Sequence, residues 1–316
     1  MKQTRINSLF GIKHAIVQAG MVWTSGWRLA AAASENGCLG LIGAGSMKPD
    51  LLSEHISKLR NYFLEKKLNF PFGVNIPLIR GDISELIKTI QEEEVKIVFS
   101  SAGNPKAFAN VFKENNITWV HVVASVKHAL KAQDAGCNAV VAEGFEAGGH
   151  NGIDEITTLC LVPQVADALE IPVIAAGGIA TGAQIAACMA IGAEGVQIGT
   201  RFAATVEASG NDAFKNKIVE AKDNDTILIM KKLNPVRLFR NKFAEEVINA
   251  ERSGAGEELL KEMLGRKREM KGIFEGDLDE GELEMGQSSG LVNEILPVKS
   301  LVERLLKEYE IAVTKL

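Results

Sequence analysis

The stretch V-V-A-E-G-F-E-A-G-G-H-N-G, residues 140–152, decides how the rest of the chain is interpreted. A short apolar run at 139–142 ends in acidic and glycine residues, and a single imidazole, His150, follows on what we expect to be a loop. Functional groups are often carried in this way, on a loop at the end of a buried strand. We therefore predict that His150 belongs to a catalytic site.

Two further stretches share this design: I-P-V-I-A-A-G-G-I at 171–179 and G-V-Q-I-G-T-R-F at 195–202. In both, a run containing β-branched residues stops at glycine. A backbone without Cβ atoms can lie close to a bound group and offer it N–H donors. We interpret these two turns, with Gly177, Gly178 and Gly199, as a phosphate-binding cradle.

Composition limits the classes of protein that the chain can belong to. It has 316 residues, of which 46% are hydrophobic and 24% charged, so about two domains are expected. The formal net charge is -5, and no basic face is visible. Nucleic-acid and membrane-surface binding both need clustered Lys and Arg. Neither a nucleic acid nor a membrane is therefore an expected partner.

The ends and the cysteines point to an ordinary cytoplasmic protein. The N-terminus, M-K-Q-T-R-I-N-S-L-F, lacks a long apolar segment, and no run approaches the length of a transmembrane helix. Cys38, Cys137, Cys160 and Cys188 lie singly in apolar or helical stretches, without the paired spacing of a zinc site. We expect reduced, buried cysteines and no metal.

Short β-like runs alternate with amphipathic helical segments along the first two hundred residues. Eight such alternations fit a (β/α)8 TIM barrel, in which the strand ends gather at one mouth and phosphate is often held after strands seven and eight. An open doubly wound sheet is the alternative. The eight expected strands are 15–18, 39–43, 73–76, 97–100, 119–123, 139–142, 173–176 and 195–198.

The pattern changes after Thr205, where the chain becomes rich in Lys, Glu, Asp and Asn. Helix-like stretches at 213–221, 236–250 and 257–268 predict a helical lid over the mouth of the barrel. The expected domains are an FMN-binding barrel at 1–205 and 287–316 and a helical lid or substrate domain at 206–286.

Six motifs in order along the chain resemble the nitronate monooxygenase family, formerly called 2-nitropropane dioxygenases, and its close relatives, the flavin-dependent enoyl-acyl-carrier-protein reductases. They are G-M at 20–21, G-V-N at 73–75, A-E-G-F-E-A-G-G-H at 142–150, A-A-G-G-I-A at 175–180, Q-I-G-T-R-F at 197–202 and M-G-Q-S-S-G at 285–290. One glycine motif alone is weak, but the ordered set spans nearly the whole chain. The resemblance implies a flavoprotein that holds FMN without a covalent bond.

The resemblance also assigns roles to residues. Gly20 and Met21 would pack along the isoalloxazine, and Asn75 would hydrogen-bond its polar edge. Gly177, Gly178, Gly199 and Thr200 would bind the FMN phosphate. The remaining positions near the flavin are Ala147, Gly148 and Gly149, with Gln287 expected to contact the cofactor and His150 to act in catalysis.

Two reactions fit one site. A nitronate monooxygenase would oxidise alkyl nitronates with O2 to carbonyl compounds and nitrite, and this is the reaction that the sequence favours. The alternative is an FMN- and NADH-dependent enoyl-acyl-carrier-protein reductase of fatty acid synthesis. A flavin-binding protein without turnover is a third class, but the presence of His150 in its glycine-rich loop argues against it. The resemblance leaves open whether the chain forms a homodimer.

Other polar residues keep structural interpretations. We expect His14, His55, His121 and His128 to be structural, with His121 the least certain because it lies in the fifth strand. Glu143 and Glu146 could form a carboxylate pair, but a hydrogen-bonding or loop-closing role is favoured.

Overall fold

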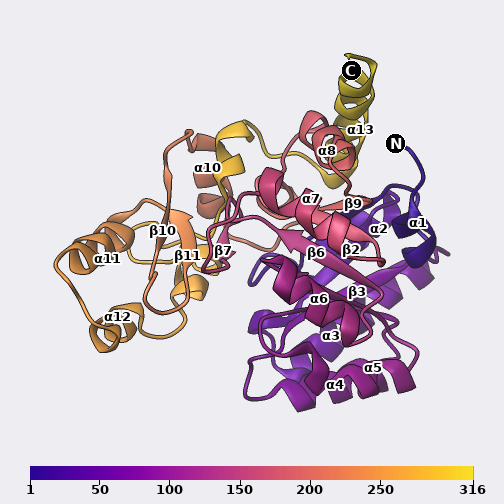
Figure 1. Ribbon diagram of the computed structural model, residues 1–316, viewed down its shortest axis with the longest axis horizontal. Helices are drawn as coiled ribbons and strands as arrows, with labels where there is room; N and C mark the ends of the chain where they lie inside the picture. The colour runs from indigo at the N-terminus through magenta and orange to yellow at the C-terminus, as the bar shows by residue number, and fades with distance from the viewer. Residues whose placement is uncertain (316) are drawn as a thin grey trace.

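Eight parallel strands close into a barrel in the computed structural model, which describes residues 1–315 (Figure 1). The order around the barrel is β1-β2-β3-β4-β5-β6-β8-β9. This closure confirms the predicted (β/α)8 barrel and excludes the open doubly wound sheet. The strands are β1 (Ile16–Gln18), β2 (Leu39–Gly43), β3 (Phe72–Pro77), β4 (Ile97–Ser101), β5 (Thr118–Val123), β6 (Ala139–Glu143), β8 (Val173–Ala176) and β9 (Gly195–Ile198).

Helices connect the strands and cover the outside of the barrel. Several begin at the side-chain caps that their sequences encode: Ser125 Oγ accepts from the His128 N–H, and Thr181 and Gln184 form a capping box. The helices outside residues 206–286 are α1 (Arg5–Phe10), α2 (Trp27–Glu35), η1 (Ala44–Ser46), α3 (Pro49–Glu65), α4 (Ile83–Glu92), η2 (Pro105–Ala107), α5 (Ala109–Glu114), α6 (Val126–Asp134), α7 (Thr158–Ala168), α8 (Gly182–Ala190), α9 (Thr200–Ala203), η4 (Gln287–Leu291) and α13 (Val298–Lys315). None of the helices in the described part of the chain has the length and apolarity needed to cross a membrane.

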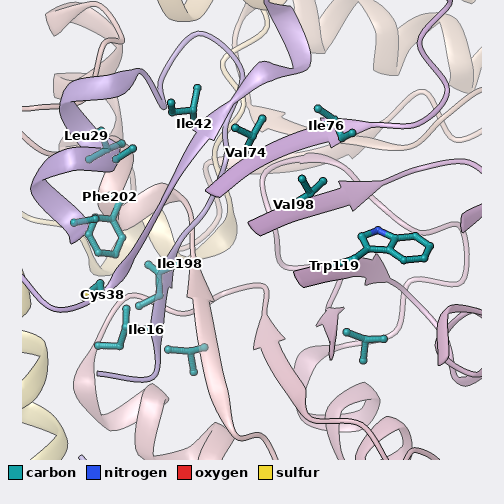
Figure 2. Close-up of a cluster of buried hydrophobic side chains, with 14 of the residues drawn as sticks. Ile16, Leu29, Cys38, Ile42, Val74, Ile76, Val98, Trp119, Ile198 and Phe202 are labelled. Atoms are coloured by element: carbon teal, nitrogen blue, oxygen red, sulfur yellow. The ribbon is translucent and has the colours of Figure 1, made fainter. Parts of the chain in front are cut away.

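The apolar core has two layers because side chains alternate along each strand. Ile16 and Ile42 belong to the large outer cluster between strands and helices, which Figure 2 shows together with Leu29 of α2. Val17 and Leu41 belong to a second, inner cluster. Cys38, Cys137 and Cys188 are buried as expected, whereas Cys160 is exposed.

Helix α1 closes one end of the barrel. Its buried side chains Ile6 and Phe10 join the inner cluster, and the Phe10 ring lies 5.7 Å from the Phe99 ring of β4, measured between centroids. Because α1 precedes β1 and fills this end with apolar side chains, the opposite end, where the strands finish, remains for polar groups.

Residues 206–286 form a mixed segment that extends to the left of the barrel in Figure 1. It holds an antiparallel pair of strands, to which a short strand from the barrel side, β7 (Gly149–His150), adds a third: β11 pairs with both β10 and β7. Its elements are α10 (Asp212–Glu220), β10 (Thr226–Ile229), β11 (Val236–Phe239), α11 (Lys242–Arg252), α12 (Glu257–Leu264) and the π-helix η3 (Met270–Phe274).

The prediction of a helix over 236–250 was therefore wrong at its start. Residues 236–239 form β11, and helix α11 begins only after Asn241, whose side chain accepts from the Ala244 N–H. The run V-R-L-F alternates a buried apolar face with one that carries Arg237, as a strand does. His150, expected on a loop, lies in β7 opposite Val236.

A close backbone contact between β2 and α2 gives a test of the packing. A Cβ atom at Gly40 would lie 1.9 Å from the carbonyl oxygen of Ala30, and a backbone atom cannot turn aside as a side chain can. We expect Gly40→Ala to lower the free energy of unfolding by about 1–3 kcal/mol or more, measured by urea unfolding. Gly81→Ala is the matched control, since no atom lies within 4 Å of its added Cβ; equal stability of the two variants would contradict the packing described.

Candidate active site

A cavity of about 1030 Å³ occupies the open mouth of the barrel, between the strand ends and residues 206–286. His150 lines it, and so do all but one of the residues assigned to the cofactor from the sequence: Gly20, Met21, Asn75, Ala147, Gly148, Gly149, Gly177, Gly178, Gly199 and Thr200. The exception is Gln287, which is exposed and lies outside the lining, although its neighbours Gly286 and Ser288 take part. The structure thus brings the sequence-predicted residues to one place, and their roles stay predictions.

The first and third strand ends meet at the floor of the cavity. A Cβ at Gly20 would lie 2.3 Å from the Cβ of Asn75, so only glycine lets the loop after β1 approach this amide. The Asn75 Nδ2 donates a long hydrogen bond, 3.5 Å, to the carbonyl oxygen of Phe99. Its Oδ1 therefore remains available to accept a hydrogen bond from a ligand.

The turns after β8 and β9 have the geometry expected of an anion cradle. Gly177 and Gly178 have φ angles of 96° and 70°, which favour glycine, and a Cβ at Gly177 would lie 2.5 Å from the carbonyl oxygen of Gly144. Among residues 1–315, the backbone N–H groups of Gly178 and Gly199 have no hydrogen-bond partner. Thr200 Oγ1 accepts from the Gly286 N–H at 2.9 Å, and this bond ties the cradle to the returning chain.

Gln197 is a lining residue that sequence reasoning did not assign to the site. It is buried in β9, and within the described chain its Oε1 has no hydrogen-bond partner. An unpaired buried amide oxygen carries a desolvation cost that an N–H of a ligand would offset. The signal was a single polar residue in the buried strand G-V-Q-I.

These observations fit FMN. The phosphate matches a glycine cradle with unpaired N–H groups, and the ring edge of a flavin presents both donors and acceptors to the amides of Asn75 and Gln197. No cluster of His, Cys, Asp and Glu suited to a metal ion occurs among the described residues.

His150 lies beside a carboxyl group from the returning chain. Its Nδ1 is 3.8 Å from Oε1 of Glu284, too long for a hydrogen bond but close enough for an ion pair when the imidazole is protonated. The imidazole is accessible from the cavity, at 68% exposure, yet desolvation by the surrounding protein lowers its pKa. Burial, followed by the charge of Glu269, raises the pKa of Glu284 to about 7. The pair can therefore hold or transfer a proton near neutral pH.

Two other carboxyl groups line the cavity, one half-buried and one buried. Burial raises the pKa of Glu143, at the end of β6, to about 7, and that of Glu282 to about 8. Glu282 and Glu284 were missed because the run E-G-E-L-E resembles a solvated return segment. Only the fold shows that these side chains face inward.

Glu146 has the loop-closing role that the sequence favoured. Its carboxylate accepts from the backbone N–H and the hydroxyl of Thr158, at the start of α7, so it joins the loop after β6 to the next helix. Glu143 and Glu146 therefore have different surroundings and do not act as a pair.

Two of the four histidines interpreted as structural line the cavity. His121 is buried, its Nδ1 lies 2.7 Å from Ser100 Oγ, and burial lowers its pKa to about 4. His128 lies on the outer part of the lining and is exposed. His14 and His55 lie outside the cavity.

Comparison with protein-family models places the chain in a family. The model described as "Nitronate monooxygenase" matches residues 3–92 and 67–308. The chain belongs to the nitronate monooxygenase family. It is therefore an oxidoreductase, and its family and solved neighbours are flavoenzymes.

Individual relatives cover much or all of the chain. It is 43% identical to FabK from Thermotoga maritima, with a TM-score of 0.93 and coverage of 100% of this chain and 98% of that one. A nitroalkane oxidase from Streptomyces ansochromogenes is 27% identical, with a TM-score of 0.84 and 99% of both chains covered. A probable nitronate monooxygenase from Staphylococcus saprophyticus is 33% identical over 71% of this chain and 75% of its own length.

The raised pKa of Glu282 gives a test of how tightly the cavity wall is packed. A carboxyl whose pKa rises from 4.5 to about 8 on folding stabilises the fold fully below about pH 4.5, and this stabilisation is lost as the pH rises through about 8. Relative to Glu282→Gln, the wild-type free energy of unfolding should fall by on the order of 3 kcal/mol between pH 5 and 9.

Urea unfolding of the cofactor-free protein at several pH values measures this difference. Glu65→Gln is the control, because Glu65 is exposed at the end of α3. A wild-type protein and a Glu282→Gln variant with parallel pH profiles would show that the Glu282 carboxyl is solvated.

Proposed function

We propose that the protein is an FMN- and NADH-dependent reductase of enoyl thioesters. The observation that carries the proposal is the likeness to FabK, an enoyl-acyl-carrier-protein reductase, which is 43% identical over the full chain. The matches to nitronate-oxidising relatives are less similar, at 27–33%. We therefore prefer enoyl reduction to nitronate oxidation, the reaction that the sequence motifs favoured.

The size of the cavity supports this choice. Pockets for single small ligands measure roughly 300–1,000 Å³, so a cavity of about 1030 Å³ is large enough for a flavin and a second, elongated molecule. A small alkyl nitronate would leave much of that volume to water.

The chain's own residues would hold the cofactor at three points. Gly177, Gly178 and Gly199 would donate backbone N–H groups to the phosphate, assisted by the Thr200 hydroxyl. Asn75 and Gln197 would hydrogen-bond the ring edge, and Gly20, Met21 and residues 147–149 would line its faces. Bound FMN would supply two-electron chemistry between NADH and the substrate.

His150 and Glu284 would supply the proton that the reaction needs. Saturation of a carbon–carbon double bond takes up two electrons and two protons, and the electron donor supplies only one of these protons. An imidazole at the cavity surface can donate the second proton to the substrate, and the protonated carboxyl of Glu284 can restore it. Excluding bulk water from this pair is the role that we assign to the lid domain, residues 206–286, over the barrel formed by 1–205 and 287–316.

Nitronate oxidation is the second candidate, and the family match favours it. In this reaction an alkyl nitronate and O2 give a carbonyl compound and nitrite. Protonated His150 would pair with the anionic substrate, and neutral His150 would take the α-proton of a nitroalkane.

A substrate panel separates the two reactions. With the FMN-loaded protein, we expect NADH oxidation to depend on crotonyl-CoA and to yield the saturated thioester, measured at 340 nm and by mass spectrometry. Oxygen consumption with propionate-3-nitronate, without NADH, should be slow by comparison. Fast nitronate turnover with no crotonyl-CoA dependence would instead establish the second candidate.

The same panel tests His150. We expect His150→Ala to keep the flavin absorbance and to lose about 100- to 10,000-fold in kcat, the usual contribution of a positioned acid or base. His14→Ala, which removes an imidazole outside the cavity, is the control. Unchanged kcat in His150→Ala would remove the residue from the mechanism.

A further inference from the structure

Two lysines and a histidine lie together on one side of the cavity, and the chemistry described above uses none of them. Lys106 belongs to η2, which follows β4, and His128 and Lys131 belong to α6, which follows β5. Residues three apart on a helix share a face, and α6 packs against η2. All three residues line the cavity. We call this cluster the basic rim.

The basic rim has no anionic partner of its own. Among residues 1–315, the side chains of Lys106, His128 and Lys131 form no ion pair and no hydrogen bond. Arg80, the arginine of the lining, differs, because its guanidinium is already bound to Asp82 and to the carbonyl oxygen of Met47. The rim side chains are therefore free to bind a ligand.

Most of the carboxyl groups of the cavity lie on a different wall from the rim. Glu269, Glu282 and Glu284 come from residues 206–286, whereas the rim comes from the barrel. The fourth, Glu143, ends β6 in the barrel, and burial raises its pKa to about 7. The two lysines of the rim therefore give this side of the cavity a positive charge that suits an anionic group of a ligand.

The rim also lies apart from the phosphate cradle proposed for FMN. The cradle follows β8 and β9, and the rim follows β4 and β5. In a closed ring of eight strands, β4 is the fourth strand and β9 the eighth, so the two lie opposite each other across the mouth. One phosphate cannot occupy both sites, so a phosphate held in the cradle leaves the rim open to a second ligand.

Local structure fixes the backbone that carries the rim. Ala102 and Gly103 have φ angles of 49° and 91°, and the Asn104 side chain accepts from the Lys106 N–H at 3.1 Å. This turn sets the direction of η2 before any ligand binds. His128 also lies close enough to the cavity floor that its charge, after burial, contributes to the low pKa of His121.

We propose that the basic rim binds the phosphate of the pantetheine arm of a thioester substrate. The inference rests on the proposed enoyl-thioester reduction and identifies the part of the substrate that the outer cavity recognises. A pantetheine arm separates its phosphate from the thioester by a long flexible chain, so the phosphate can sit at the rim while the reacting carbons lie near His150. The pyrophosphate of NADH offers the same chemistry, and the experiment separates these two sources.

Binding is measured first, without turnover. Coenzyme A is titrated calorimetrically into FMN-loaded wild type, the double variant Lys106→Ala/Lys131→Ala, and the control Lys127→Ala, an exposed lysine of α6 outside the cavity lining. We expect the double variant to bind coenzyme A at least about tenfold more weakly and the control to match wild type. Pantetheine, which lacks the phosphate, should bind all three proteins equally. Equal coenzyme A affinities in all three would overturn the proposal.

Kinetics then identify the source of the phosphate. In the double variant we expect the KM for crotonyl-CoA to rise about tenfold or more with kcat nearly unchanged, and the KM for crotonyl-N-acetylcysteamine, which carries no phosphate, to stay the same. A rise confined to the KM for NADH would assign the rim to the dinucleotide and overturn the assignment to the thioester. If no enoyl reduction occurs but coenzyme A binding still depends on Lys106 and Lys131, the phosphate site stands and the proposed function fails.

Discussion

Parallel pairing of β6, β8 and β9 is the constraint on which the site depends. Glu143 pairs with Ala176, and Ala176 pairs with Gln197, so three strands finish at the same level of the barrel. A shift of this register would move the turn at Gly178 away from the turn at Gly199. The two turns, whose N–H groups are unpaired, would then no longer lie beside each other at the mouth. Helix α1 fills the opposite end with apolar side chains and so leaves a single mouth for polar ligands.

The second sheet of the protein, which is antiparallel, connects the barrel to residues 206–286 beside His150. His150 pairs with Val236 and Gly149 with Arg237, so this strand pairing fixes the backbone that carries the imidazole of His150. Arg237 also donates through Nε to the carbonyl oxygen of Phe145, which secures the same loop a second time. Movement of residues 206–286 would therefore shift His150 directly, and this β-sheet link makes these residues a part of the site.

The barrel could be predicted from the sequence because each strand is a short buried run that ends in glycine or polar residues, and these local signals agree with the fold. The strand β11 could not be predicted, since V-R-L-F lies just before helix α11 in the sequence. Pairing with β10 and β7 makes this run a strand. The site was predicted where glycine motifs mark it. Glu284 and Gln197 were not predicted to belong to the site, because their importance comes from burial and from neighbours distant in the sequence.

We propose that the turns at Gly178 and Gly199 hold the phosphate of FMN. The most direct test is to titrate the cofactor-free protein with FMN and with riboflavin, which has the same ring but no phosphate, and to follow the quenching of flavin fluorescence. We expect riboflavin to bind at least about 100-fold more weakly, because charge-assisted hydrogen bonds from the cradle are lost. Equal affinities for the two flavins would show that the cradle does not bind the phosphate.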